Sequence, residues 1–489
     1  MRTRLYFDDG AQGFLMLLLI SQFFFTNGFI LFLGMLIFFI LFNHIQQPYK
    51  PSVFTIILFY HFLQISAGIW QSNYLGKEIN YRSRNTDTAI IMSYLGLLAV
   101  FLPIIYYQNK IPALSRKKLL EYADKLSIDK TFRVYIIAFF AMNALTGVAF
   151  LIPSLSQAII SLSNIKWMIF LLFGFQSILK KRKMREFVIF ALLEFVTGFY
   201  SYFSEFKTVI FFVLFLFLSL MAVIRFNKLI IAAVAMVLLV IGGVFWTSVK
   251  SEYRNFLNNG SSTQTVRVDK GAALDKLLEL SGKQDESSYS GAMADFLDRL
   301  QYTYHLAKTM DRVPDIIPYQ NGNNLATTLT FVLTPRLLDP NKGTYDASVK
   351  ASKYTGIQYL GSKKGVSVSL GYFADGFIDF GYFGMFLPLL ALGFVYGKSY
   401  FYFIKNASNN FIFNYAVVGA IFMELFAFES DSIFLFGRLY VNIVIFFVLK
   451  MVFFPKLMNY ISIPQKPKEQ VEEELKERQP GEIILNSKF

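Results

Sequence analysis

The chain has 489 residues, of which 55% are apolar and only 16% are charged, and its formal net charge is +14. Soluble domains carry about 25% charged residues, so this composition indicates a membrane protein and excludes an ordinary soluble domain. Cysteine is absent, which excludes disulfides, thiolate metal sites and cysteine nucleophiles, and the three widely spaced histidines, His44, His61 and His305, argue against a histidine metal site.

Segments long enough to cross a membrane, roughly 17–25 mostly apolar residues each, recur along the chain. The first apolar run, residues 14–43, contains Thr26-Asn27-Gly28 at its centre. We interpret this run as two short helices that break there, with one long tilted helix as the alternative. Further spans are predicted at residues 52–70, 88–107, 133–152, 160–179, 187–204, 208–224, 229–246, 375–397, 411–429 and 432–455. The sequence therefore predicts an all-α polytopic membrane protein of eleven or twelve transmembrane helices.

The distribution of Lys and Arg between successive short loops predicts the orientation of these helices, because basic loops stay on the cytoplasmic side. Seven basic residues lie in the loop 108–133 and five in the turn 180–185, whereas the loops 153–166 and 204–207 hold one each. We therefore expect the basic loops and both chain ends to face the cytoplasm, and the large hydrophilic stretch of the chain to be extracytoplasmic.

This topology divides the chain into four parts. They are an N-terminal transmembrane bundle of residues 1–246, a large extracytoplasmic loop of residues 247–370, C-terminal transmembrane helices in residues 371–455 and a cytoplasmic tail of residues 456–489. The short loop 71–87 is expected on the same side as the large loop. The protein would then be a multi-pass protein of the cytoplasmic (inner) membrane.

The large loop has a helical pattern of its own. Apolar side chains recur at helical spacing between residues 289 and 312, which predicts a helix lying on the surface. Pro314 is expected to end that helix. Residues 325–338 are apolar but too short to cross a membrane, so we expect them to lie in the membrane interface or to pack on helix ends.

Several charged residues lie within or beside predicted spans, where a charge at the bilayer centre costs at least about 2.5–3.5 kcal/mol and normally faces a cavity or a partner. They are Glu194, Glu205, Lys207, Asp375, Asp379, Glu424, Glu429, Asp431 and Arg438. All but Glu194 lie towards the outer half of the membrane on the predicted topology, on the side of the large loop. Pairing of Arg438 with Glu424 or Asp431, simply to hold helices together, is the alternative to a site.

The large loop also presents cations whose placement suits an anionic ligand. Pro335 and Pro340 restrict the backbone around Arg336, and Lys342 follows closely in the sequence. Arginine binds phosphate in a bidentate manner, and lysine acts as a compact point charge. We therefore interpret the loop as part of a site for a lipid-linked anionic substrate, held over the membrane helices.

Plainer roles are open for two other cations and for a histidine. Arg254 follows a helix end, where its side chain can snorkel to the membrane surface. Arg299 lies four residues after Asp295 on a predicted helix, where an ordinary salt bridge can form. His305 can be a plain residue on the surface of the same helix.

Three segments resemble the bacterial O-antigen and exopolysaccharide polymerases of the Wzy type, also called oligosaccharide repeat-unit polymerases. Lys250-Ser-Glu-Tyr-Arg254 follows the span that leads into the loop, where the family often has a Tyr-Arg pair. Thr334-Pro-Arg-Leu-Leu-Asp-Pro-Asn-Lys342 is similar to the family's Pro-Arg…Pro-x-Lys segment. Ala374-Asp-Gly-Phe-Ile-Asp-Phe-Gly-Tyr-Phe-Gly384 is similar to the helix that follows the family's loop, with Asp375 and Asp379 where Glu and Asn are usual.

The resemblance implies a GT-C-like, metal-independent glycosyltransferase without a cofactor, which moves a growing glycan from polyprenyl diphosphate to a lipid-linked repeat unit. Cations would stabilise the leaving diphosphate, and the candidates are Arg254, Arg299, Arg336 and Lys342, followed by Lys207 and Arg438. A base would activate the acceptor hydroxyl, and the candidates are Asp375, Asp379, Glu205, Glu252 and His305. The implied partners are the lipid-linked oligosaccharides, membrane lipid, a chain-length regulator and a flippase, and no nucleic acid.

Other functions fit parts of this pattern. An O-antigen ligase would share the architecture and differ in the acceptor. A polysaccharide flippase or other transporter is a second alternative, although transporters usually carry their charges near the middle of the membrane, between repeats. A non-catalytic membrane scaffold is the third.

The topology makes a direct prediction. Reporter domains fused at Lys118 and at Lys183 are expected to read cytoplasmic, and one fused at Lys283 to read extracytoplasmic, because of the loop charges. Paired enzyme reporters that are active on opposite sides of the membrane measure this. A reversed reading at any of the three positions would contradict the topology.

Overall fold

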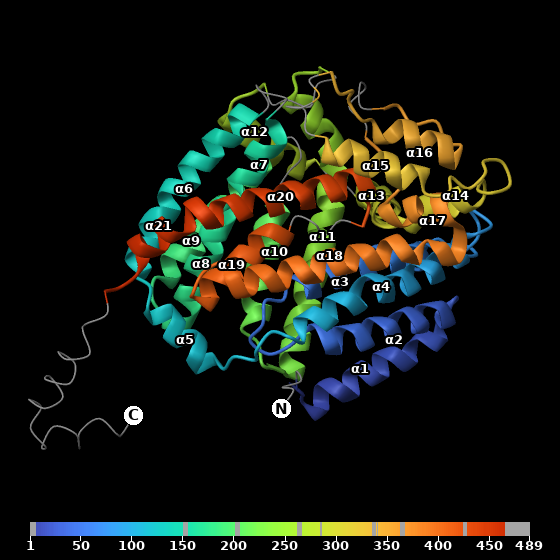
Figure 1. The fold of residues 1–489 in the computed structure, drawn as a ribbon. Coiled ribbons are helices and arrows are strands. Elements are labelled where there is room, and N and C mark those ends of the chain that lie inside the picture. Colours follow the sequence, from blue (N-terminus) through green and yellow to red (C-terminus); the bar gives the residue numbers. More distant parts are fainter. Residues whose placement is uncertain are drawn as a thin grey trace, which may run out of the picture.

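The computed structural model of the protein describes residues 6–149, 155–200, 206–261, 267–283, 286–334, 339, 341–361, 367–423 and 428–464. Within these ranges the chain is mostly helical, and only two short strands occur, β1 (Tyr6–Phe7) and β2 (Val223–Ile224), which pair in parallel. Figure 1 shows the helices packed side by side, with the N-terminal helices α1 and α2 at the lower edge of the view.

The first half of the chain forms most of the apolar helices. Their bounds are α1 (Asp9–Ser21), η1 (Gln22–Phe24), α2 (Gly28–Ile45), α3 (Val53–Tyr74), α4 (Thr86–Gln108), α5 (Arg116–Asp124), α6 (Ile128–Ala149), α7 (Ser156–Ser163), α8 (Ile165–Lys180), α9 (Met184–Thr197), η2 (Gly198–Tyr200), α10 (Phe206–Ser219) and α11 (Phe226–Leu257).

The second half contains the helices of the large loop and the C-terminal apolar helices. Their bounds are α12 (Lys270–Gly282), α13 (Glu286–Leu300), α14 (Thr303–Met310), α15 (Asn323–Leu333), α16 (Ala347–Thr355), α17 (Tyr372–Gly384), α18 (Phe386–Asn406), α19 (Phe411–Phe422), α20 (Ser432–Val452) and α21 (Phe454–Ile461).

Seven helices in the described part of the chain are long and apolar enough to cross a membrane, fewer than the eleven or twelve that the sequence predicts. They are Gly28–Ile45, Val53–Tyr74, Thr86–Gln108, Ser156–Lys180, Phe226–Leu257, Phe386–Asn406 and Ser432–Val452. Several other predicted spans form shorter helices, because α9, α10 and α19 have only 14, 14 and 12 residues. The fold is therefore that of an all-α membrane protein with both long and short apolar helices.

The first apolar run is two helices, as predicted, rather than one. Asn27 adopts the left-handed conformation, with φ of 58°. A Cβ atom on Gly28 would lie only 1.9 Å from the carbonyl oxygen of Gln22, so only glycine fits there. The chain therefore turns sharply between α1 and α2.

The prediction of a single span over residues 375–397 is wrong, because helical geometry is interrupted at Gly381, near the C-terminal end of α17 and ahead of α18. Gly381 has a φ of +68°, which side chains other than glycine rarely adopt. Its Cα also packs against the ring of Tyr319, from which a Cβ would lie 2.9 Å away. The break leaves α17 as a separate, largely buried helix ahead of the longer α18.

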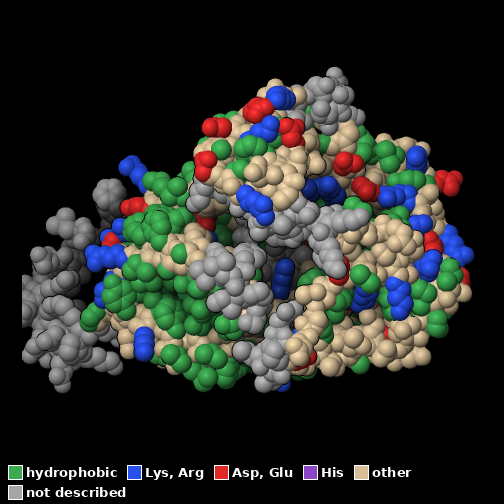
Figure 2. Space-filling view, turned by 90° about the horizontal axis from the view of Figure 1, so that it is seen from above, with side chains coloured by type: hydrophobic (Ala, Val, Ile, Leu, Met, Phe, Trp, Pro, Cys, Tyr) green, Lys and Arg blue, Asp and Glu red, His purple; other side chains and the backbone are tan. Residues whose placement is uncertain are grey.

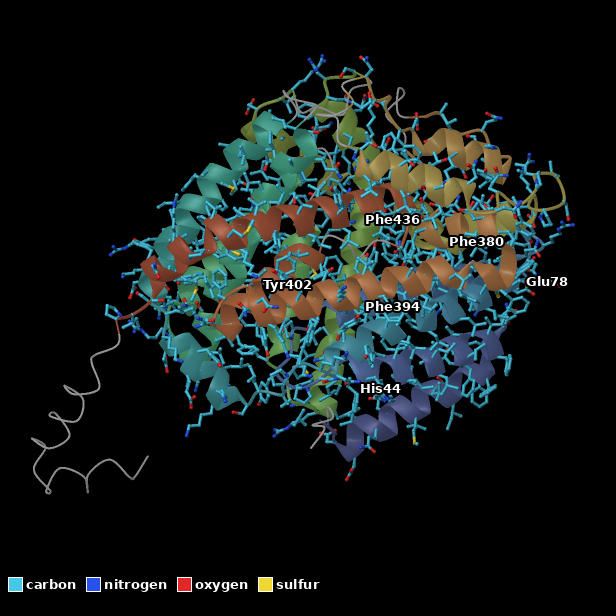
Figure 3. All side chains as sticks on the ribbon, viewed as in Figure 1. His44, Glu78, Phe380, Phe394, Tyr402 and Phe436 are labelled. Carbon is cyan, nitrogen blue, oxygen red and sulfur yellow. The ribbon has the colours of Figure 1, made fainter. Side chains whose placement is uncertain are left out.

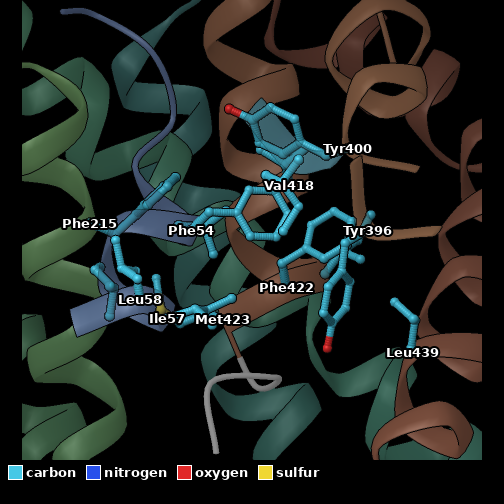
Figure 4. Close-up of a cluster of buried hydrophobic side chains, with 14 of the residues drawn as sticks. Phe54, Ile57, Leu58, Phe215, Tyr396, Tyr400, Val418, Phe422, Met423 and Leu439 are labelled. Atoms are coloured by element: carbon cyan, nitrogen blue, oxygen red, sulfur yellow. The ribbon is translucent and has the colours of Figure 1, made fainter. Parts of the chain in front are cut away.

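The helices of the central bundle pack closely through small residues. A Cβ atom on Gly393 of α18 would lie 2.2 Å from the carbonyl oxygen of Val100 on α4, so these two backbones touch. Aromatic rings fill the neighbouring space, with Phe54 at 5.1 Å from Tyr400 and 5.4 Å from Phe422 between ring centroids (Figure 4).

The large loop forms two helices where the sequence predicts one over residues 289–312. The chain leaves helical geometry between α13 and α14, where the side-chain amide of Gln301 donates to Gln71 and the N–H of Tyr302 donates to the carbonyl of Gln64, at 3.4 Å. Both partners lie on α3, so contacts with a membrane helix cause the break. The second helix ends at Met310, ahead of Pro314.

The structure groups the loops as the predicted topology requires. In the short loop 71–87, Arg82 pairs with Asp298 of α13 and Arg84 lies 2.6 Å from Asp315, so this loop and the large loop lie together. At the opposite end, the N–H of Ser127 donates to the carbonyl of Ile461 at 2.7 Å. Which of these ends faces the cytoplasm stays a prediction.

A buried ion pair joins α8 to α9. The ammonium of Lys166 on α8 lies 2.9 Å from the carboxylate of Glu194 on α9. Asn143 accepts from the same ammonium at 3.0 Å, and the hydroxyl of Tyr135 donates to Glu194 at 3.1 Å. Both carboxylate oxygens of Glu194 therefore have partners, and the residue holds α6, α8 and α9 together.

Removing one member of this pair should be much more damaging than removing both. Lys166→Met leaves the Glu194 charge buried without a cation and is expected to lower the free energy of unfolding by about 3–5 kcal/mol. The double variant Lys166→Met with Glu194→Leu should recover most of that loss. Unfolding of the purified protein in detergent measures both, and equal losses in the single and double variants would contradict the assignment.

Candidate functional site

Asp379 holds α15 against α17. Its side chain is 1% exposed, and its two carboxylate oxygens accept the N–H groups of Asn324 at 3.0 Å and of Leu325 at 2.7 Å. These are N–H groups of the first turn of α15, which have no acceptor inside the helix and carry the positive end of its dipole. A carboxylate placed there stabilises the helix end, so Asp379 acts as a cap supplied from a neighbouring helix.

Asp375 and Asp431 meet at the start of α20. Asp375 accepts the N–H of Ser432 at 2.8 Å, and Asp431 caps the helix by accepting the N–H of Phe434 at 3.2 Å. The ammonium of Lys350 lies 2.5 Å from the second oxygen of Asp375, without the angles of a hydrogen bond. Lys350 thus supplies one positive charge for two buried carboxylates.

A tyrosine of the large loop completes this group. The hydroxyl of Tyr345 donates to the carboxylate of Asp431, which is only 1% exposed. Burial, followed by the negative charge of nearby Asp375, raises the pKa of Asp431 to about 6, against the opposing charge of Lys350. Lys350 and Tyr345 are not among the candidates from the sequence, because neither residue belongs to an apolar pattern or to one of the motifs.

The space beside these carboxylates is small. A cavity of about 10 Å³ is lined by polar groups of Asn324, Asp375, Asp379 and Ser432 and by apolar side chains that include Phe436. Phe436 lies on α20 (Figure 3). A volume of about 10–15 Å³ holds one water molecule, so Asp375 and Asp379 face room for a water rather than for a sugar.

Four cations gather where α10, α11 and α13 meet; we call them the cation cluster, and they are Lys207, Lys250, Arg254 and Arg299. Aromatic packing brings the first two helices together, since the ring of Phe206 lies 5.6 Å from that of Trp246. Lys207 follows Phe206 directly, and Lys250 comes one helical turn after Trp246. This packing therefore places the side chains of Lys207 and Lys250 at a similar height along α10 and α11.

The third helix joins the cluster through a close contact. A Cβ atom on Gly243 of α11 would lie 2.5 Å from the ring of Phe296, so α13 packs directly on α11. Arg299 follows Phe296 by one turn, and the positive charges of Arg299, Arg254 and Lys207 all repel that of Lys250. Figure 2 shows a hollow in the face seen from above, with Lys and Arg side chains at its walls.

The cation cluster differs from other cations of the same loop in its partners. Lys207, Lys250 and Arg299 form no ion pair with any residue that the structure describes, whereas Lys276 lies 3.0 Å from Glu252 and Lys283 pairs with Glu279. The salt bridge of Arg299 with Asp295 that its spacing allows is thus not formed. Adjacent like charges repel one another, and a bound anion would relieve that repulsion.

Lys342 and Arg438, two of the predicted diphosphate ligands, lie outside the cation cluster. The ammonium of Lys342 donates to the carbonyl oxygens of Thr334, at 2.8 Å, and of Phe331, and so binds the C-terminal end of α15. Arg438 is exposed on α20 and forms no ion pair with Asp431 in the described part of the chain, and its pairing with Glu424 stays a prediction. Arg336, Glu205 and Glu424 lie outside the residues that the structure describes.

His305 is half-buried among aromatic rings rather than on an open helix surface. The hydroxyl of Tyr359 lies 3.2 Å from its Nδ1 atom, and the ring of Tyr302 lies 4.7 Å away between centroids. Burial lowers the pKa of His305 to about 4. The imidazole is therefore neutral at pH 7 and a weak base.

Two further findings bear on identity. In the part of the chain that the structure describes, no three His, Cys, Asp or Glu side chains are grouped so that they could hold a metal ion. Residues 55–466 match one family, described as Domain of unknown function (DUF8712). No curated protein and no solved structure matches the chain.

The raised pKa of Asp431 makes a prediction about stability. Its ordinary value is 3.8 and its value in the folded protein is about 6, so the folded state binds the proton more tightly than the unfolded state. Asp431 therefore favours folding at pH 4, and this contribution is lost as the pH rises through 6. Asp431→Asn keeps an acceptor for Tyr345 and a helix cap but has no proton to lose.

The measurement is unfolding of the purified protein between pH 4 and pH 7.5. We expect the Asp431→Asn protein to be more stable than the wild type at pH 7, with the difference shrinking towards pH 4. The matched control is Asp295→Asn on the exposed face of α13, which should leave the pH dependence unchanged. A constant difference between wild type and Asp431→Asn at all pH values would contradict the assignment.

Proposed function

The chain belongs to the DUF8712 family, and we propose that it is a polysaccharide polymerase of the cytoplasmic membrane. In this proposal it transfers a growing glycan from polyprenyl diphosphate to a lipid-linked oligosaccharide repeat unit on the outer side of the membrane. The cation cluster of Lys207, Lys250, Arg254 and Arg299 is the observation that carries the proposal. Three of the four residues were already candidates for a diphosphate site from the sequence and its resemblance to the polymerases.

The chemistry of the leaving group explains what such a cluster would do. When the bond between the donor sugar and the diphosphate breaks, the electron pair goes to the diphosphate oxygen, and negative charge grows there. Fixed Arg and Lys side chains stabilise this charge without having to reorganise. Diphosphate is a good leaving group already, so the reaction requires positive charge more than it requires a general acid.

The helix that carries Lys250 and Arg254 also suits a lipid substrate. Along its apolar part α11 is almost entirely uncovered by other helices, with Ile231 66% and Leu238 63% exposed. An apolar face that leads to a group of cations matches an amphiphile with an isoprenoid chain and a diphosphate head. In the proposal, the lipid chain lies along α11 and its diphosphate reaches the cation cluster.

Under this proposal, the carboxylates near the large loop have different roles. Asp375 and Asp379, which the sequence suggests as bases, are occupied with the helix ends of α20 and α15. The structure thus supports a positioning role for both residues: they hold α15 and α20 beside α17. A GT-C-like arrangement of the whole remains part of the proposal.

The cation cluster makes a binding prediction with a defined probe. Farnesyl diphosphate, a short polyprenyl diphosphate, should bind the purified protein, and Lys250→Ala or Arg299→Ala should weaken its binding about tenfold or more, since hydrogen bonds to charged groups contribute about 1.5–3 kcal/mol. The matched control is Lys283→Ala, which removes an exposed lysine that pairs with Glu279. Isothermal titration in detergent measures the affinities.

Polymer formation in cells tests the reaction itself. Cells that depend on this chain for polymer synthesis should accumulate unextended repeat units with Lys250→Ala and make normal polymer with Lys283→Ala. Transfer to a second lipid without extension would indicate a ligase, and movement of lipid-linked units across vesicles without new bonds would indicate a flippase. Equal farnesyl diphosphate affinities in wild type, Lys250→Ala and Arg299→Ala would contradict the proposed site.

A further inference from the structure

Glu429 is a carboxylate that the caps and ion pairs of the fold do not use. It lies in the connection between α19 and α20 and is half-buried. The side-chain amide of Gln64 on α3 donates to its Oε2 atom at 2.5 Å. Its other oxygen, Oε1, has no hydrogen-bond partner among the described residues, and Glu429 forms no ion pair with any of them.

The orientation of Glu429 is fixed by the residue that binds it. The carbonyl oxygen of the Gln64 side chain accepts the N–H of Phe428 at 3.1 Å, so the amide nitrogen of the same side chain has to point at Glu429. The backbone carbonyl of Gln64 in turn accepts the N–H of Tyr302 at 3.4 Å. Gln64 therefore holds α3, the Glu429 connection and the start of α14 in one arrangement.

Other ionisable groups surround Glu429, but no cation in the described part of the chain pairs with it. The pKa of Tyr302 is raised, first by burial and then by the negative charge of Glu429, with a smaller contribution from Asp431. Tyr302 donates its hydroxyl to the carbonyl of Ser369 at 2.7 Å, so it is engaged elsewhere. A partly buried carboxylate without a cation costs free energy unless something else uses it.

Hydrogen bonds of Gln64 connect Glu429 to the start of α14, the helix that follows the one carrying Arg299. Gln64 contacts both Glu429 and Tyr302, and Tyr302 comes three residues after Arg299. Three residues span at most about 11 Å between Cα atoms. One connected framework of α3, α13 and α14 thus carries Arg299, which would face the diphosphate of the donor, and adjoins Glu429, which would face the hydroxyl of the acceptor sugar.

We propose that Glu429 is the general base of the transfer reaction, with Gln64 as the positioning residue that aims it. This inference rests on the proposed function. The hydroxyl oxygen of the acceptor sugar forms a bond to the anomeric carbon of the donor sugar, and the bond from that carbon to the diphosphate oxygen breaks with its electron pair. The hydroxyl proton passes to Oε1 of Glu429 and is then released to water.

The decisive variant is Glu429→Gln, which keeps the size of the side chain and removes the base. General-base catalysis contributes roughly 10²–10⁴-fold to a rate, so we expect the rate of chain extension to fall by at least about 10²-fold while the affinity for farnesyl diphosphate stays within about twofold of wild type. Lys250→Ala should show the opposite pattern, with weakened affinity. The matched control, Glu78→Gln, changes an exposed glutamate of the short loop 71–87 (Figure 3) and should extend chains normally.

The two proposals fail in different ways. A folded Glu429→Gln protein that extends chains at the wild-type rate overturns the role of Glu429 and leaves the polymerase proposal standing. A wild-type protein that neither extends chains nor binds farnesyl diphosphate overturns both. If Glu429→Gln does not fold, Glu429→Asp keeps the charge but withdraws it by one methylene: a loss of about 10²-fold in rate at unchanged affinity supports the role, and the wild-type rate overturns it.

Discussion

The bonds from buried aspartates to the first N–H groups of α15 and α20 determine how the large loop is joined to the membrane helices. Asp379 binds the start of α15, and Asp375 with Asp431 binds the start of α20. A buried carboxylate is costly unless positive charge or N–H groups surround it, and helix ends provide both partial charge and donors. Backbone N–H groups thus satisfy most of the oxygens of these three aspartates, and Lys350 is the cation that lies beside them.

This use of backbone donors has a consequence for the cations. Because helix ends balance the aspartates, Lys207, Lys250 and Arg299 are not drawn into ion pairs with them and remain together between α10, α11 and α13. Lys166 and Glu194 follow the ordinary rule that buried charges pair with an opposite charge, since they neutralise each other between α8 and α9. The contrast supports an anion site at the first location and a purely structural role at the second.

Sequence patterns predict those features that depend on neighbouring residues in the chain. Apolar length located α3 and α4 to within a few residues, and Asn27-Gly28 marked the break after α1 because a left-handed residue followed by glycine ends a helix locally. The break at Gly381 was missed, since its cause is the ring of Tyr319, 62 residues earlier in the chain. The length of the apolar runs alone also overestimated the number of spans, because α10, for example, has only 14 residues.

The candidate site was predictable as a list of residue types but not as a set of roles. The cost of charge near a membrane identified Asp375, Asp379 and Glu429 together, yet whether a carboxylate caps a helix or faces a substrate depends on α15, α20 and Gln64, which are distant in sequence. Lys250 stood in a recognised segment, but its importance comes from Phe206 packing on Trp246. The neighbours in space, rather than the residue types, thus distinguish Asp375 and Asp379, which bind helix ends, from Glu429, which accepts from Gln64.

The large loop is not an independent domain, and this matters for the chemistry proposed here. Gln301 of the loop binds Gln71 of α3, and Asn85 at the start of α4 donates to Asp311 at 3.0 Å, so loop and membrane helices share their hydrogen bonds. Groups held in this way keep their separation without reorganising when a substrate arrives, which is the condition under which fixed charges stabilise a transition state. A diphosphate at the membrane surface would therefore meet cations from membrane and loop helices at once, with a base aimed from a third element.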